Sequence, residues 1–133
     1  MGDPETEVVI PRIESDLLDL FEGVATQTLD QKSFDLTSKT ATTVMVVAGG
    51  YPEAYEKGKV ISGLENVEGT TVFHAGTKIN ENEIVTNGGR VMTFTSLGET
   101  MEEALEKSYS NIAKVSFDGM NYRKDIGFDL KNL

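Results

Sequence analysis

The sequence contains no cysteine, a single histidine and few basic residues, and each shortage excludes a kind of chemistry. Without cysteine there are no disulfides, thiolate metal sites or cysteine nucleophiles, which fits a cytoplasmic protein. One histidine cannot form a multi-histidine metal site. Twelve Lys and Arg against 22 Asp and Glu give a formal net charge of −10. Nucleic acids and anionic membranes require clustered cations, so we expect neither as a partner.

Long apolar runs are also absent. No run approaches the roughly 18 residues that a membrane-spanning helix needs, and the acidic first residues predict no signal peptide. With 133 residues, 38% of them hydrophobic, we expect one modest domain, or a small domain with a piece of another. A phosphorylated metabolite would be bound by a few local cations and backbone amides, against the overall negative field.

The stretch Thr-Asn-Gly-Gly-Arg at residues 86–90 stands out from its surroundings. It lies between two runs of alternating apolar residues, 83–85 and 91–95, and an Asn-Gly step in that position predicts a β-hairpin. Consecutive glycines let backbone N–H groups approach a ligand closely. Arg90 is shaped to hold a phosphate or carboxylate through two parallel hydrogen bonds. The alternative is a plain hairpin with a solvated Arg90, and the local sequence leaves both open.

The N-terminal part predicts two short helices. Asp3 is placed to cap a first helix, which Pro11 interrupts because it lacks an N–H group. Ser15 or Asp16 can begin a second, apolar helix. Residues 25–39 are polar and rich in turn-forming types, so we interpret them as a connection or domain boundary.

From residue 40 the sequence becomes typical of β-structure. Residues 41–48 predict a buried strand, and 59–61 and 70–78 predict two more. A polar hairpin turn is expected at residues 80–83. His74 lies on the strand over 70–78, and its type allows either a proton carrier near neutral pH or a packed or hydrogen-bonded structural residue.

The clearest helix follows these strands. Thr100 and Glu103 have the spacing of a capping box. Apolar side chains recur at three- and four-residue steps on the predicted core face: Met101, Ala104, Leu105, Tyr109, Ile112 and Ala113. The opposite face carries Glu102, Glu106, Lys107, Asn111 and Lys114. Strands over residues 40–95, mostly joined by hairpins and followed by one covering helix, predict an α+β fold with an antiparallel sheet.

Several motifs, in this order and spacing, resemble one enzyme family. They are GDPET at 2–6, GGYP at 49–52, FHAGT at 73–77, TNGGRV at 86–91 and YRKDIG at 122–127. Together they are similar to the C-terminal part of phosphoribosylamine–glycine ligases, also called glycinamide ribonucleotide synthetases, which are ATP-grasp enzymes. Asn-Gly-Gly-Arg alone also resembles the C-terminal domain of biotin carboxylases, so a fragment of such a carboxylase is the alternative enzyme. A free-standing, non-catalytic binding module is a third interpretation.

The resemblance implies a ligase of purine synthesis. Such an enzyme joins 5-phosphoribosylamine to glycine and uses ATP, with Mg²⁺ or Mn²⁺, through a glycyl phosphate intermediate. Residues 1–39 would be the last helices of the ATP-grasp domain, and 40–133 the small C-terminal domain, similar to a rudiment single hybrid motif. The family's metal ligands would lie upstream of Met1, so we expect this chain to bind no metal or ATP alone. We expect it to be inactive without the N-terminal and ATP-grasp domains of its own chain.

The resemblance also assigns substrate-binding residues, although it identifies no catalytic residue. The phosphoribosylamine side of the cleft would be lined by Asn87, Gly88, Gly89, Arg90, His74 and Gly76, with Ala75 beside them. The region of glycine and the metal would be bordered by Asp3, Pro4 and Glu5. Among these residues, Arg90 is the expected contact to a substrate phosphate or carboxylate.

Overall fold

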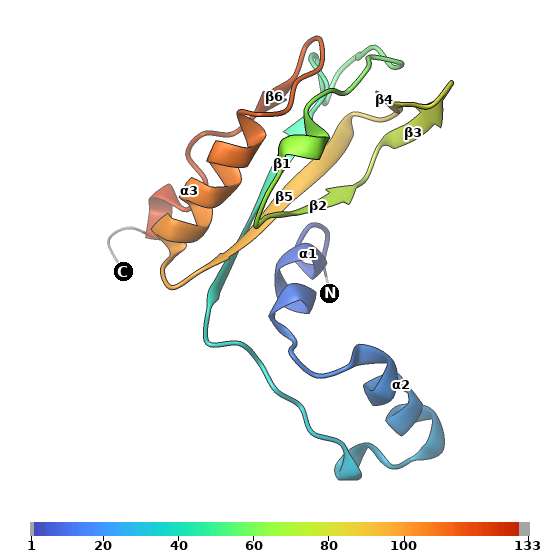
Figure 1. Ribbon diagram of the computed structural model, residues 1–133, viewed down its shortest axis with the longest axis vertical. Helices are drawn as coiled ribbons and strands as arrows, with labels where there is room; N and C mark the ends of the chain where they lie inside the picture. Colours follow the sequence, from blue (N-terminus) through green and yellow to red (C-terminus); the bar gives the residue numbers. More distant parts are fainter. Residues whose placement is uncertain (1, 131–133) are drawn as a thin grey trace.

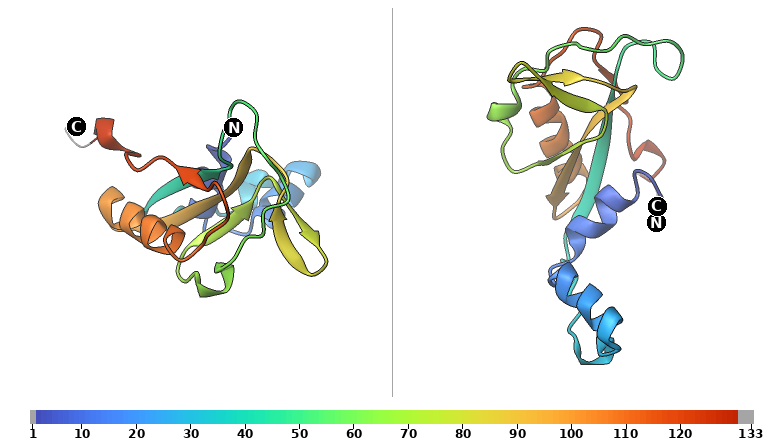
Figure 2. Two further views of the ribbon diagram at one scale, coloured as in Figure 1. Left: turned by 90° about the horizontal axis from the view of Figure 1, so that it is seen from above. Right: turned by 90° about the vertical axis from the view of Figure 1, so that its right-hand side faces the viewer.

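A computed structural model describes residues 2–130 of the chain. Residues 2–39 form a helical arm, and residues 40–130 form a body built on a β-sheet (Figure 1). The arm contains α1 (Thr6–Val9), the 3₁₀ turn η1 (Ile10–Arg12), α2 (Leu17–Thr26) and η2 (Leu29–Gln31). Figure 2 shows that α1 lies beside β1 whereas α2 and η2 project away from the body.

The two arm helices begin differently. Asp16 caps α2, because its carboxylate accepts hydrogen bonds from the amides of Leu18 and Asp19 at 2.8 and 3.3 Å. That prediction is confirmed. The prediction that Asp3 caps the first helix is wrong, since α1 begins at Thr6 and has no side-chain cap. The Asp3 carboxylate instead contacts the body, as described below.

The main sheet of the body is antiparallel, with strand order β2-β5-β1-β6. Its strands are β1 (Thr40–Val47), β2 (Thr71–His74), β5 (Arg90–Gly98) and β6 (Asn121–Tyr122). A second, two-stranded sheet consists of β3 (Thr77–Asn80) and β4 (Glu83–Thr86). The helix α3 (Met101–Ile112) covers one face of the main sheet (Figure 1), and the short turns η3 (Leu64–Asn66) and η4 (Phe128–Leu130) complete the body. The predicted α+β fold with an antiparallel sheet is therefore confirmed.

The strand connections differ from the prediction in one important place. The hairpin at residues 80–83 is confirmed, and its two tip residues, Glu81 and Asn82, have the positive φ angles of 48° and 72° that a tight turn requires. The Asn87-Gly88 step does not form a hairpin. It links β4 of the small sheet to β5 of the main sheet, and these two strands do not pair.

Two further strand predictions need correction. Residues 59–61 form no strand, although Val60 makes an isolated bridge to Val85. The predicted strand over 70–78 is divided at Ala75 and Gly76 into β2 and β3, which belong to different sheets. The body is therefore held together by long-range strand pairing, and β3–β4 is the one hairpin between consecutive strands among the described residues.

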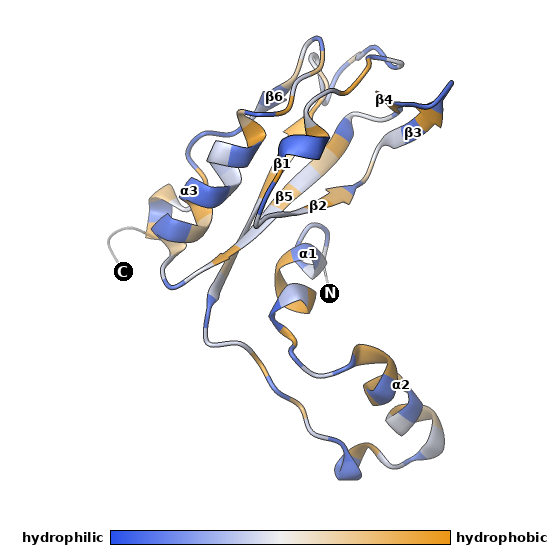
Figure 3. Ribbon diagram, viewed as in Figure 1, coloured by the Kyte–Doolittle hydropathy of each residue, from blue (hydrophilic) through white to orange (hydrophobic). Residues whose placement is uncertain are grey.

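The core lies between α3 and the main sheet. Val44, Val46, Met92 and Phe94 are fully buried there, and the strands and α3 show the corresponding apolar stripes in Figure 3. On α3, the buried residues are Ala104, Leu105, Ser108, Asn111 and Ile112. The placement of Asn111 on the polar face is thus wrong, as is the placement of Ala113 in the core, since Ala113 is exposed. Within residues 2–130, no helix is both long and apolar enough to cross a membrane.

Candidate functional site

Arg90 is the first residue of β5 and lies at the edge of the body that faces the arm. Its Nη2 atom lies 2.8 Å from Oδ2 of Asp3. The hydrogen bond that Arg90 donates to the Asp3 carboxylate is the main reason why the pKa of Arg90 is raised above its ordinary value. The Arg90 side chain remains 43% exposed. A permanently charged guanidinium therefore stands at the junction of arm and body, with part of its surface open.

A cavity of about 360 Å³ surrounds this ion pair. The arm contributes Gly2, Asp3, Pro4, Thr6 and Glu7, and the body contributes Met45, His74, Ala75 and Arg90. The sequence had assigned Asp3 and Pro4 to one region of a substrate cleft and His74 and Arg90 to another. The structure brings these four residues together around a single cavity.

The remaining predicted site residues lie close by but do not line the cavity. Glu5 holds the local turn, because its carboxylate accepts a hydrogen bond from the Gly2 amide at 2.6 Å. Asn87 is exposed, and its backbone N–H donates to the carbonyl of Gly76 at 2.7 Å. The structure therefore gives both residues a part in positioning the backbone around Arg90.

The glycines of the two motifs allow two chain segments to cross at close range. A Cβ atom added to Gly76 would lie 2.4 Å from the carbonyl oxygen of Arg90 and 2.7 Å from Cα of Gly88. Any side chain at Gly76 would push the segment before β3 away from the segment before β5. The close crossing fixes the start of β5, and with it the base of Arg90.

Gly89 is needed for a second close contact. A Cβ atom on Gly89 would lie 2.1 Å from the ring of Tyr51, and that ring also meets Tyr55 edge-on at 6.1 Å between centroids. Within residues 2–130, the amides of Gly88 and Gly89 donate no hydrogen bond. Buried backbone N–H groups are nearly always paired in proteins. Neither glycine lines the Arg90 cavity, and Gly89 is buried.

His74 is a surface residue rather than a packed one. It is exposed, and its Nδ1 atom lies 2.9 Å from Oγ1 of Thr77, so it is hydrogen-bonded. Besides the Arg90 cavity, it borders a second cavity of about 330 Å³ beside the β3–β4 hairpin. Of the two structural possibilities for this histidine, the structure shows hydrogen bonding and excludes burial in the core.

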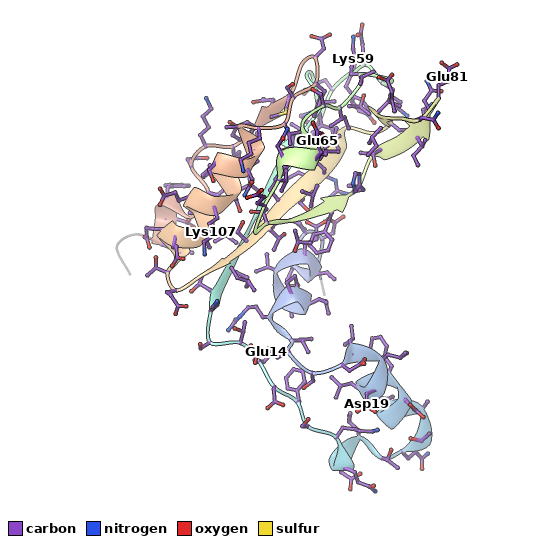
Figure 4. The ribbon with its side chains drawn as sticks, viewed as in Figure 1. Glu14, Asp19, Lys59, Glu65, Glu81 and Lys107 are labelled. Atoms are coloured by element: carbon purple, nitrogen blue, oxygen red, sulfur yellow. The ribbon has the colours of Figure 1, made fainter. Side chains whose placement is uncertain are left out.

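Lys59 was not predicted as a site residue. Its ammonium group lies 2.7 Å from Glu56 and 3.0 Å from Asp118, beside a small cavity of about 130 Å³, and Figure 4 places it at the end of the body opposite the arm. Hydrogen bonds to these two carboxylates raise the pKa of Lys59. The Lys59 backbone exchanges hydrogen bonds with Thr86, the residue before the Asn-Gly step. No local sequence signal could reveal this cluster, because Asp118 is distant in the sequence.

The cations near the C-terminal end form a separate local feature. Arg123 donates two hydrogen bonds to Asp125, at 2.9 and 3.0 Å, and this bidentate pair lowers the pKa of the Asp125 carboxyl. Arg123 is therefore an exposed arginine whose partner lies two residues away in the sequence. Residues 2–130 contain no group of three or more His, Asp or Glu side chains arranged to hold a metal ion.

The fold and the cavity define a small α+β domain in which Arg90 of the body contacts a helical arm. Comparison with known proteins then identifies the family. The sequence profile described as "Phosphoribosylglycinamide synthetase, C domain" matches residues 41–129. The chain belongs to the phosphoribosylglycinamide synthetase family, which confirms the resemblance inferred from the ordered motifs.

Individual relatives agree with this result. The chain is 46% identical to a phosphoribosylamine–glycine ligase of Vibrio parahaemolyticus, over 96% of this chain and 30% of the relative. It is 46% identical to a bifunctional purine biosynthetic protein purD of Dictyostelium discoideum, over 96% of this chain and 16% of the relative. The crystal structure of a phosphoribosylamine–glycine ligase from Thermotoga maritima matches with a TM-score of 0.73 and 36% identity, over 94% of this chain and 31% of that one. The chain thus spans about a third or less of the length of these relatives.

Proposed function

We propose that this chain is part of a ligase that condenses 5-phosphoribosylamine with glycine, using ATP, to form glycinamide ribonucleotide in purine synthesis. The observation that carries the proposal is 46% identity to a phosphoribosylamine–glycine ligase across 96% of the chain. In this proposal, residues 1–39 are the end of the ATP-grasp domain and residues 40–133 are the C-terminal domain. The arm and body seen in the structure would then be the parts of the enzyme that border the substrate cleft.

The cavity around Arg90 is the proposed substrate site on this chain. The reaction needs an anion site because phosphoribosylamine carries a phosphate and glycine a carboxylate. Arg90 offers a charged, partly open guanidinium, and charge-assisted hydrogen bonds to such groups are about twice as strong as neutral ones. This concentration of donors acts locally, in a chain whose net charge is −10.

In the proposed reaction, ATP phosphorylates the glycine carboxylate, and the amine of phosphoribosylamine attacks the resulting acyl phosphate. The residues of this chain would bind and orient an anionic substrate and keep water away from the acyl phosphate. A divalent metal would neutralise the phosphates. Residues 2–130 form no cluster of acidic side chains that could hold such a metal. In this proposal, ATP and Mg²⁺ or Mn²⁺ would be held by the remainder of the ligase.

A chimaeric enzyme provides the test of this function. The corresponding part of the Thermotoga maritima ligase is replaced by this chain, and formation of glycinamide ribonucleotide is measured. We expect the chimaera to be active and the 133-residue chain alone to be inactive. An inactive chimaera that is folded and binds ATP would contradict the proposal, and so would product formation by the isolated chain.

Arg90→Ala in the chimaera tests the site. Loss of a charge-assisted hydrogen bond costs about 1.5–3 kcal/mol, so we expect KM for phosphoribosylamine to rise by about 10- to 150-fold. Arg123→Ala is the matched control, because Arg123 is also an exposed, paired arginine but lies away from the cavity. If Arg90→Ala changes neither KM nor kcat, the assigned role of Arg90 is wrong.

A further inference from the structure

The turn that carries Asp3 is held by its own neighbours. The amide and the hydroxyl of Thr6 both donate to the carbonyl of Gly2, at 3.1 and 2.9 Å. The Gly2 amide in turn donates to Glu5. These bonds close the turn without the Asp3 side chain, which does not cap α1. The Asp3 carboxylate is thus presented from a fixed backbone and is free to act elsewhere.

The Asp3 carboxylate contacts Arg90 at one corner of the guanidinium group. The contact runs from Nη2 to a single carboxylate oxygen, and Arg90 makes no other side-chain hydrogen bond to residues 2–130. A guanidinium carries five N–H donors in a rigid plane. A single contact holds the group at one corner and leaves most of its donors available. A bidentate pair, such as Arg123 with Asp125, would occupy a whole edge instead.

Anchoring matters because a free arginine side chain is costly to order. Arginine has about 2 kcal/mol of rotamer entropy, and less is lost on binding when the group is already in place. Within the described residues, Asp3–Arg90 is also the one ion pair that joins arm and body. The anchor therefore sets the position of Arg90 relative to both walls of the cavity.

We propose that Asp3 is a positioning residue for anion binding: through its single hydrogen bond it fixes the Arg90 guanidinium so that the remaining N–H donors face the cavity. This inference rests on the proposed function of Arg90. It assigns Asp3 no contact with the substrate. It requires the hydrogen-bond acceptor at position 3, and not its negative charge.

Binding of ribose 5-phosphate to the 133-residue chain, followed by NMR titration, tests the inference. Asp3→Asn and Asp3→Ala both remove the negative charge, but only Asp3→Asn keeps an oxygen that accepts from Arg90. We expect Asp3→Asn to bind about fivefold or more tightly than Asp3→Ala, a factor typical of one hydrogen bond. The order parameter of the Arg90 Nε–H bond should fall in Asp3→Ala and stay high in Asp3→Asn.

The outcomes separate the two proposals. Equal affinities of the two Asp3 variants would overturn the positioning role, and affinities equally higher than that of the unaltered chain would make Asp3 a competing anion. If Arg90→Ala binds ribose 5-phosphate as well as the unaltered chain, the anion site itself is wrong. Absence of ribose 5-phosphate binding to both the unaltered chain and the chimaera would overturn the anion site and, with it, the positioning role. Each variant is folded if its backbone amide NMR spectrum matches that of the unaltered chain outside residues 2–7 and 87–91.

Discussion

At the scale of single residues, Asn111 is a buried polar group that joins α3 to the rest of the body. It is only 3% exposed. Its side-chain amide donates to the carbonyl of Glu68 and to Thr70, both at 2.8 Å, and its carbonyl accepts from the Glu68 amide at 3.1 Å. A buried amide is tolerated in the core because these bonds replace the ones it would make to water. The helix is thereby tied to the segment that leads into β2.

We predict that Asn111→Ala lowers the free energy of unfolding by about 2–3 kcal/mol, because it leaves the backbone groups of Glu68 without partners. Urea unfolding followed by circular dichroism measures this change. Ser110→Ala is the control on the same helix, since Ser110 is exposed and its loss should change stability by less than about 0.5 kcal/mol. Equal effects of the two substitutions would contradict the role given to Asn111.

The sequence indicates which residue types are suited to chemistry but not which of them meet. Arg90 is recognisable because it follows two glycines at the end of a polar turn. Its partner Asp3 is not, because the local pattern assigns Asp3 to a helix cap. The cluster around Lys59 is hidden for the same reason. Such pairs are made by tertiary packing, and no short-range spacing encodes them.

At the scale of secondary-structure elements, the start of α3 follows its sequence closely. The Thr100 hydroxyl accepts from the Glu103 amide at 3.2 Å, and the Glu103 carboxylate accepts from the Glu99 amide at 2.9 Å. The predicted capping box is confirmed, with Glu99 as the reciprocal donor. A hydrogen bond from Lys107 is the main reason why the pKa of Glu103 is lowered, and the Glu99 amide adds to this.

This lowered pKa predicts how the stability of α3 depends on pH. A carboxyl whose pKa is lower in the folded state stabilises the fold above its unfolded pKa, ordinarily about 4.5, and loses that contribution as the pH falls through the folded value. We expect Glu103→Gln to lower Tm at pH 7 and to have little effect at pH 3. Glu106→Gln, on the exposed side of the same helix, should lower Tm at neither pH. If Glu103→Gln changes Tm by the same amount at pH 7 and pH 3, the prediction is refuted.

The misplaced hairpin has a specific physical cause. Asn87-Gly88 between two apolar runs is a strong local signal for pairing β4 with β5. In the structure both edges of β5 are already used, one by β1 and the other by β2. A central strand has no free edge for β4, which pairs with β3 instead. Strand existence was therefore predictable for β1 and β5, whereas strand partners depend on the whole sheet.

At the scale of the whole molecule, the arm and the body differ in how well their apolar residues are covered. On α2, Leu18, Phe21 and Val24 are 75%, 60% and 61% exposed. Parts of the α2 ribbon, which projects away from the body, carry the hydrophobic colour in Figure 3. Leu29 and Phe34 are also exposed and line the same hollow as Phe21 and Val24. The sequence predicted the apolar helix and its separation from the sheet. It did not predict that α1, at the start of the chain, packs beside β1.

We predict that the isolated chain self-associates through α2, because contiguous exposed apolar surface favours burial against a second copy. Phe21→Ser combined with Val24→Ser should lower the apparent mass in sedimentation experiments. Ile79→Ser is the control, since Ile79 is 78% exposed but lies on the β3–β4 hairpin of the body. Higher salt should strengthen association by screening the repulsion between chains of charge −10. Dependence on Ile79 instead of α2 would contradict the prediction.

The edges of the main sheet have a consequence of another kind. Its outermost strands are short, with four residues in β2 and two in β6. Because β6 pairs with β1 only at Val46 and Val47, the outer edge of β1 over residues 40–45 has no strand partner within residues 2–130. Fibril growth begins where a long, flat strand edge recruits further chains. On this sheet, the outer edge of β1 over residues 40–45 is such a template. When chains gather through the arm, we expect this edge of β1 to be the place where strands of different chains pair.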